Sequence, residues 1–445
     1  MALINVSATR FLLFALAVAP LPIFCLINPY LKAHPLVDHK QILETESEGQ
    51  LKQAYYETVI GTDVSSDIRR LTKARARGKV QPFYSKPFPC KNTSWFKSPI
   101  RPTSVHKLMP GDIQVVAAMG DSLTSGTGAT AISMFDTLIE NRGFSWSVGG
   151  FGTWRDTLTV PNILRIYNPH LVGYSVRTTT SVDGRVGGAA FNVAEAGALS
   201  RHMLYQAKVL VERIRGSDSV DFYRDWKLVT LMVGNNDICS EMCYLKNPNI
   251  IVDVHYWSIR DALDYLRDNL PRTFVNVVPT SKVAYLPSVR FPNSCYLTHT
   301  IFCSCIFGPK YRANREFYIS ISDRLQQATI DAVHDGGYSW KYETFAAVTQ
   351  PYLVNSIFRF VATPANNFQP LDIMKFTSPD CFHYNQFGYA ITANAMWNNM
   401  LQPIGQKHSM EPDEVFFHFH CPTFKHPYFF TGRNSKIVSQ LKKKH

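Results

Sequence analysis

The sequence predicts an α/β fold in which a mostly parallel sheet lies between layers of helices. Two short apolar runs, residues 113–119 and 228–233, contain β-branched residues, and each stops at a glycine. Such runs are typical of buried strands that end at one edge of a sheet. Helical patterns alternate with strand-like runs further along the chain, which favours parallel strands joined by helices. With 445 residues, 45% of them hydrophobic, the chain can form one large domain with a sizeable core.

The later elements follow in order. Apolar residues recur at helical spacing in residues 198–214, 253–270 and 315–334. Residues 274–278 and 345–348 are short apolar runs that predict two more strands. The carboxyl edge of such a sheet is where open α/β folds place reactive groups.

Ser122 is a candidate nucleophile at that edge. It follows the first predicted strand in the segment Gly120-Asp121-Ser122-Leu123, where small residues allow a sharp turn that exposes one hydroxyl. The alternative is a serine- and glycine-rich turn that only starts a helix.

Asp380 and His383 are candidates for the base that such a serine needs. They are three residues apart, so one helical turn or a tight loop places both side chains on the same side. The carboxylate would then hold the imidazole tautomer while the other ring nitrogen accepts the serine proton. The alternative is a surface loop in which the aspartate caps a helix and the histidine is solvated.

Asn236 and Gly197 are candidates for stabilising a developing oxyanion. Asn236 follows the apolar run at 228–233, and a side-chain amide at a strand's carboxyl end can donate to a substrate oxygen. Gly197 lets a backbone N–H approach a substrate closely. Either residue is also compatible with an ordinary junction between a strand and a turn.

Together and in this order, these pieces resemble the GDSL or SGNH hydrolases, whose four sequence blocks carry Ser, Gly, Asn and His. The blocks fall on Ser122, Gly197, Asn236 and His383. The resemblance implies a three-layer α/β/α sandwich of flavodoxin-like type. It also implies that Ser122 attacks the acyl carbon, that His383 acts as base and then acid, and that Asp380 orients His383. The oxyanion hole would be formed by the N–H groups of Ser122 and Gly197 and by the Asn236 amide.

Segments outside the four blocks resemble the animal phospholipase B branch of this family over roughly residues 104–435. The chain shows one set of blocks and ends in a lysine-rich stretch without an apolar span. An architecture of several repeats with a C-terminal membrane anchor is therefore not expected.

The predicted organisation has four parts. Residues 1–27 contain a 17-residue apolar run after Arg10 and predict a cleaved signal peptide, with an uncleaved signal anchor as the alternative. Residues 28–103 precede or pack on the catalytic domain, residues 104–408 form the hydrolase domain, and residues 409–445 form a tail.

Cysteine content supports export. Nine cysteines are present, and removal of Cys25 with the signal leaves an even set of eight. Cys239 and Cys243 are a candidate local disulfide that would brace the loop carrying Asn236, and a bridge at Cys381 could stiffen the turn between Asp380 and His383. The spacings do not match the usual zinc motifs, so no metal is expected. Asn92 begins a glycosylation sequon, which fits a secreted surface loop.

The formal charge of +12 favours anionic partners, including phospholipid surfaces. Nucleic acid is the usual alternative, but no nucleic-acid motif is present and the export signal argues against it. The basic run at 69–79 is expected to be a solvated helix face, with a processing site or a contact for lipid headgroups as alternatives.

The sequence thus predicts a secreted serine ester hydrolase that needs no cofactor and touches the membrane surface only transiently. The resemblance implies that its substrates are phospholipids and lysophospholipids. One alternative is an esterase or lipase for other acyl esters, since this fold hosts many activities. The other is a lipid-binding protein without catalysis. The oligomeric state is not predicted.

Overall fold

The computed structural model describes residues 49–361, 372–411, 414–416 and 418–436. The chain divides into two compact units, Met1–Ile60 and Gly61–His445. Of the first unit, only residues 49–60 are described, and they are helical, ending in the π-helix Tyr56–Ile60. The predicted signal segment at 1–27 and Cys25 lie outside the described residues.

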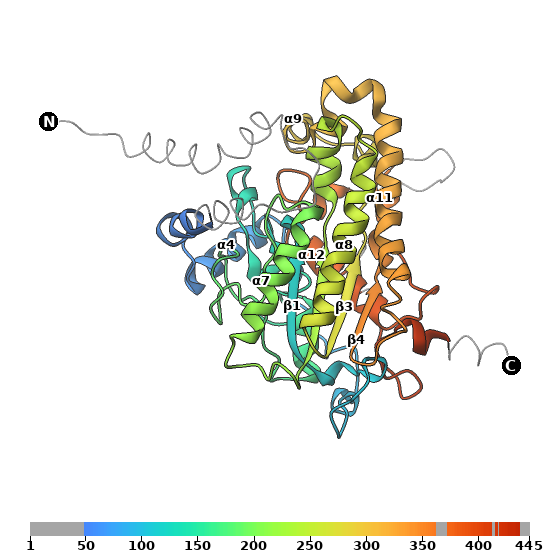
Figure 1. Ribbon diagram of the computed structural model, residues 1–445. Coiled ribbons are helices and arrows are strands. Elements are labelled where there is room, and N and C mark those ends of the chain that lie inside the picture. The colour runs from blue at the N-terminus through green and yellow to red at the C-terminus, as the bar shows by residue number, and fades with distance from the viewer. Residues whose placement is uncertain (1–48, 362–371, 412–413, 417, 437–445) are drawn as a thin grey trace. The chain divides into compact units, whose positions relative to one another are not determined.

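A parallel four-stranded sheet forms the centre of the second unit (Figure 1). Its spatial order is the same as its chain order: β1 (Ile113–Gly120), β2 (Trp226–Met232), β3 (Thr273–Val278) and β4 (Phe345–Thr349). Because all strands run in the same direction, their carboxyl ends share one edge. This edge carries the residues that follow β1 and β2.

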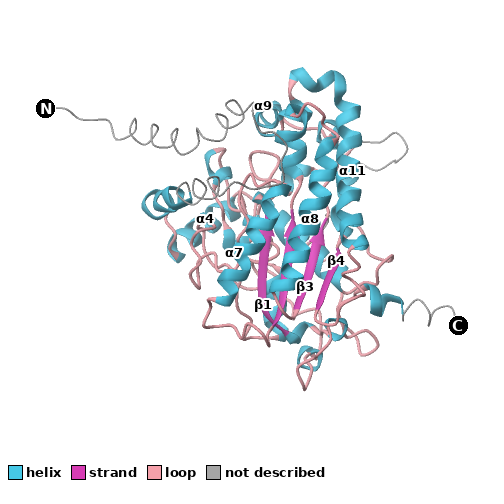
Figure 2. Ribbon diagram, in the orientation of Figure 1, coloured by secondary structure: helices cyan, strands magenta, loops and turns pink. Residues whose placement is uncertain are grey.

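Each face of the sheet packs against its own layer of helices. In β1, Val115, Ala117 and Met119 belong to one hydrophobic cluster, and Val116 and Ala118 belong to the other, as the two-residue period of a strand requires. The first face is covered by α7 (Met203–Arg215), α8 (Ile250–Asn269) and the C-terminal part of α11 (Arg315–Asp335), which Figure 2 shows in front of the strands.

The second face is covered by α6 (Val160–Tyr167) and α12 (Gln386–Met400). Nearly every residue of α12 is buried, so this helix lies inside the unit rather than on its surface. Tyr167 and Trp397 stack between the two helices with ring centroids 5.5 Å apart. The predicted α/β fold, with a parallel sheet between helical layers, is therefore confirmed.

All seven strands and helices expected from the sequence are present, with shifted ends. The first predicted helix starts at Met203 because Ser200–His202 forms a 3-10 turn before it. The labelled α-helices that were not predicted are α6, α12 and four others. These four are α4 (Val64–Ala76), α5 (Ser122–Ser125), α9 (Asn293–Phe302) and α10 (Ser304–Phe307).

Residues before and after the predicted hydrolase domain also enter the core. Leu71 of α4 and Phe96 belong to the same cluster as α12, and so does Phe429 of the predicted tail. The boundaries at residues 104 and 408 remain predictions. The basic run at 69–79 begins on α4, where Arg69 and Arg75 are both exposed. Asn92 is exposed.

The predicted Cys239–Cys243 disulfide is wrong. Four bridges join the eight cysteines of the described chain, and they pair residues 62 to 331 positions apart. Cys239 and Cys243 lie four residues apart along consecutive helical turns, so both side chains face the same neighbouring segment. Each meets a different cysteine there. The pairs are Cys90–Cys421, Cys239–Cys303, Cys243–Cys305 and Cys295–Cys381.

Within the described residues, no helix is both long enough and apolar enough to cross a membrane.

Candidate active site

Ser122 lies directly beyond the carboxyl end of β1, on a turn that only glycine permits. Gly120 has φ +148°, and a Cβ there would lie 2.1 Å from the carbonyl oxygen of Met232 in the neighbouring strand. The chain therefore leaves the strand sharply, and Asp121 caps the short helix α5 by accepting a hydrogen bond from the N–H of Leu123 at 3.0 Å. Ser122 is the first residue of this helix.

The structure brings Ser122, His383 and Asp380 into one hydrogen-bonded chain, although 261 residues separate the serine from the histidine. His383 Nε2 lies 2.8 Å from Ser122 Oγ, and His383 Nδ1 lies 2.6 Å from Asp380 Oδ2. Because a carboxylate can only accept, the ring proton belongs on Nδ1, which leaves Nε2 to accept the serine hydroxyl. The histidine side chain is 12% exposed and that of Asp380 is 2% exposed.

The Asp380 carboxylate is held from several sides. Its Oδ1 accepts hydrogen bonds from Ser378 Oγ at 2.7 Å and from the backbone N–H groups of Phe382 and His383, both at 3.0 Å. Burial acts to raise the pKa of Asp380, but the positive charge that His383 can carry and these hydrogen bonds lower the pKa below its ordinary value. The group therefore remains a carboxylate that can orient the imidazole.

The turn between Asp380 and His383 is fixed to α9. Cys381 has φ +62°, an uncommon conformation for a residue with a side chain, and its disulfide to Cys295 ties the turn to that helix. The buried ring of His299, also on α9, lies 3.2 Å through Nε2 from the Cys381 carbonyl oxygen. The predicted bridge at Cys381 is therefore present, and its partner is Cys295 of α9.

The three candidate oxyanion donors come from loops at the same edge. Asn236 follows β2, and its amide Nδ2 donates to the carbonyl of Ala198 at 3.0 Å, next to Gly197. The Gly197 loop is attached to the end of β1 because Glu195 N–H donates to Gly120 O at 3.1 Å. In the described part of the chain, the backbone N–H groups of Ser122 and Gly197 have no acceptor. Both are therefore available to a ligand.

A family model described as GDSL-like lipase/acylhydrolase matches residues 116–396, which include every residue of this site. The chain belongs to the GDSL-like lipase/acylhydrolase family. The predicted membership is confirmed, and the chain is thus a member of a family of carboxylic ester hydrolases.

Curated relatives of this GDSL-family chain are named "Phospholipase B1, membrane-associated". The human protein is 38% identical over 351 residues, which are 78% of this chain and 23% of the relative. The mouse protein is 37% identical over 343 residues, which are 76% of this chain and 22% of the relative. The rat protein is 36% identical over 345 residues, with the same coverage. The chain therefore spans less than a quarter of the length of these relatives.

Gln206 supports the turn at Gly120–Leu123 that carries Ser122, and this role was not predicted from the sequence. This buried α7 side chain accepts from Gly120 N–H at 2.7 Å and donates to Gly120 O at 3.0 Å. It thereby replaces strand hydrogen bonds that the turn interrupts. A polar residue on the apolar face of the predicted helix was the available signal.

A second buried network joins the loops of Gly197 and Asn236. Ser200 N–H donates to Asp237, and Ser200 Oγ lies 2.6 Å from Nδ1 of His255, whose Nε2 lies 2.6 Å from Thr329 Oγ1. Burial lowers the pKa of His255 to about 3, so this ring is neutral. The network connects both donor loops to α8 and α11.

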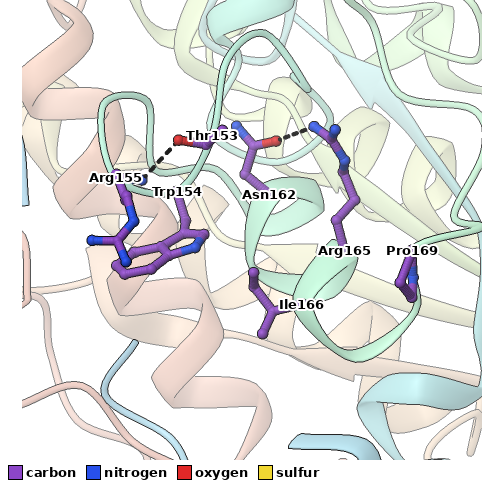
Figure 3. Close-up of a pocket in the computed structure, with 7 residues that line it drawn as sticks. All are labelled: Thr153, Trp154, Arg155, Asn162, Arg165, Ile166 and Pro169. Atoms are coloured by element: carbon purple, nitrogen blue, oxygen red, sulfur yellow. Dashed lines mark hydrogen bonds between the residues drawn. The ribbon is translucent and has the colours of Figure 1, made fainter. Parts of the chain in front are cut away.

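The aromatic residues of the segment 144–154 lie in the core. Phe144, Trp146, Phe151 and Trp154 are all buried. Trp154 lines a pocket of about 270 Å³ that is not formed by the triad residues (Figure 3). Figure 3 shows the hydrogen bond that Arg165 donates to Asn162, and Arg155 lies over the Trp154 ring.

No group of three or more His, Cys, Asp or Glu residues that could hold a metal ion is found among the described residues.

Proposed function

We propose that this chain hydrolyses the acyl ester bonds of phospholipids and lysophospholipids through an acyl-enzyme on Ser122. The observation that carries the proposal is the continuous hydrogen-bonded chain from Ser122 through His383 to Asp380. The similarity to proteins named phospholipase B1 supports phospholipids as the substrate class.

In the first half of the reaction, Ser122 Oγ attacks the acyl carbonyl carbon while His383 Nε2 takes the hydroxyl proton. The carbonyl oxygen becomes an oxyanion. The N–H groups of Ser122 and Gly197 and the Asn236 amide donate to it. Collapse of this intermediate breaks the ester C–O bond, and His383 returns the proton to the departing alcohol oxygen.

In the second half, water attacks the acyl-serine. His383 again takes a proton, and the same three donors stabilise the second oxyanion. Collapse of this intermediate breaks the bond between the acyl carbon and Ser122 Oγ, and His383 returns its proton to Oγ, so the products are the fatty acid and the free Ser122 hydroxyl. Asp380 remains ionised throughout and stabilises the imidazolium that forms twice per turnover. The side chains supply the nucleophile and both proton transfers, so the proposed cycle uses no cofactor.

We also propose that the protein is secreted and meets the membrane surface transiently. Four disulfides among the described cysteines support an oxidising compartment. The exposed position of Asn92 is compatible with glycosylation.

The test is fatty-acid release by the purified protein from vesicles of diacyl phosphatidylcholine and from lysophosphatidylcholine, with Ser122→Ala as the paired variant. We expect release from both lipids, and we expect the variant to lose at least about 10³-fold in rate. Labelling by a fluorophosphonate, which requires an activated serine, is measured on both proteins.

The three outcomes separate the alternatives. Release that depends on Ser122 supports the proposal. Labelling without release from either lipid would indicate that the substrate is another acyl ester. Absence of both release and labelling would indicate a binding protein rather than an enzyme.

A further inference from the structure

Helix α9 presents an apolar face to solvent. Leu297 and Ile301 are 69% and 62% exposed, and Tyr296 beside them is 38% exposed. The opposite side of the helix carries Cys295 and His299, both buried. Because Leu297 and Ile301 are four residues apart, they lie on the same side of the helix. The helix is thus anchored on one side and exposes large apolar groups on the other.

The segment around α9 is basic. Residues 283–315 contain one lysine and three arginines and no aspartate or glutamate. Arg290 precedes the helix and Arg312 follows it, both are exposed, and neither forms an ion pair with a described carboxylate. Exposed aliphatic groups flanked by unpaired cations match an anionic lipid surface, which offers an apolar interior behind negative headgroups.

The opposite, buried side of α9 is directly connected to the proposed active site. The Cys295–Cys381 disulfide joins α9 to the turn that carries Asp380 and His383, and His299 contacts the same turn. Figure 1 shows α9 beyond the ends of the strands. A surface that holds α9 would therefore also hold the site close to that surface.

We propose that Leu297, Ile301 and Tyr296, with Arg290 and Arg312, form a docking surface for an anionic phospholipid bilayer. We refer to these five residues as the α9 surface. The inference rests on the proposed function, because it names where the lipid substrate is met. It differs from that function in that docking is measurable without hydrolysis.

The experiment measures binding to vesicles in the Ser122→Ala background, so that no lipid is consumed. Vesicles of phosphatidylcholine alone and of equimolar phosphatidylcholine and phosphatidylglycerol are sedimented with the protein. We expect Leu297→Ser/Ile301→Ser to lower the partition coefficient on both vesicle types by about tenfold or more. We expect Arg290→Gln/Arg312→Gln to lower it on the anionic vesicles by about fivefold per arginine, with little change on phosphatidylcholine.

The matched control is Ile100→Ser. Ile100 is 83% exposed and lies near Pro102, whose carbonyl accepts from Trp226 at the amino end of β2, so it is remote from α9. This variant should bind vesicles like the parent. With Ser122 restored, Leu297→Ser/Ile301→Ser should keep its rate on a water-soluble short-chain ester and lose rate on vesicles.

Two results would overturn the docking surface. One is equal vesicle binding by the parent and the Leu297→Ser/Ile301→Ser variant. The other is a parent that binds no vesicles but self-associates in sedimentation velocity through the same residues, which would assign the face to a second copy of the chain. A protein that docks as expected but releases no fatty acid would contradict the proposed function while leaving the surface intact.

Discussion

Asp121 is a buried carboxyl group next to the proposed nucleophile, and its titration should affect stability. Burial raises its pKa to about 6, although the Leu123 N–H and the charge of His383 act in the opposite direction. In the unfolded chain its pKa is near 3.8. Because the folded pKa is the higher one, stability from this group is complete below about pH 4 and is lost as the pH rises through about 6.

Asp121→Asn removes this dependence, because the amide stays neutral while its oxygen can still accept from Leu123. The free energy of unfolding of the variant, relative to the native protein, should therefore rise between pH 4 and pH 7 by up to about 3 kcal/mol. Urea denaturation at several pH values measures this difference. Asp218→Asn, at an exposed position, is the control. A constant difference across the range would mean that Asp121 is ionised throughout.

Asn236 is the side-chain donor of the proposed oxyanion hole. One of its two amide hydrogens is used by Ala198 O, which leaves the other for substrate. Asn236→Ala should lower kcat by about 10² to 10³-fold with a smaller change in KM, because the interaction strengthens as charge develops. Steady-state kinetics on a soluble ester measures the split. A loss confined to KM would place Asn236 in ground-state binding instead.

Residues that belong to short sequence blocks could be predicted, and residues that support them could not. Ser122 and His383 were proposed from their own neighbourhoods, and the structure brings them within 2.8 Å. Gln206 and His255 lie in ordinary helical patterns. Their role depends on which loop faces each helix, and that is decided by tertiary packing.

At the scale of elements, α7 holds the end of β1 through one side chain, that of Gln206, which forms two hydrogen bonds with the Gly120 backbone. Gln206→Ala would leave the buried N–H of Gly120 without an acceptor, which costs about 1–3 kcal/mol, whereas the Gly120 carbonyl would keep its hydrogen bond from Glu195 N–H. We expect lower thermal stability together with a reduced kcat, because the turn that carries Ser122 loses its support. Thermal unfolding and kinetics on the same preparation test both effects.

Glu212→Ala is the matched control for that experiment. Glu212 lies on the same helix but is exposed, and among the described residues its ion pair is with Arg215, so its loss should change stability little. If Gln206→Ala lowered stability without any effect on kcat, the two Gln206 hydrogen bonds would stabilise the fold without positioning Ser122.

Helices and strands could be predicted because their periodicity reflects burial on one or both sides. The cysteine pairing could not, and the local Cys239–Cys243 bridge was wrong. Spacing along the chain shows which cysteines share a side of a helix. It does not show which segment faces that side, and here the facing segment carries Cys303 and Cys305.

At the scale of the whole second unit, distant parts of the chain share one core. Leu71, Phe96 and Phe429 pack in the same cluster as α12, and Cys90–Cys421 joins segments on either side of the sheet-forming region. The sequence left the role of residues 28–103 open because this segment is charged and only partly periodic. Its apolar contacts are scattered, and only the folded arrangement gathers them.

The disulfides should therefore contribute unequally to stability. Cys90–Cys421 closes a span of 331 residues, whereas Cys243–Cys305 lies beside Cys239–Cys303 and closes only a small additional loop. In the chain-entropy description, losing the first should cost about 5 kcal/mol and losing Cys243–Cys305 about 2 kcal/mol. Paired Cys→Ser variants of each bridge, compared by urea denaturation, measure the two costs. Because neither bridge touches the triad, both variants should keep their kcat on a soluble ester at temperatures where they remain folded. Equal costs would show that the native contacts around each bridge, rather than the restriction of the unfolded chain, determine what these disulfides contribute.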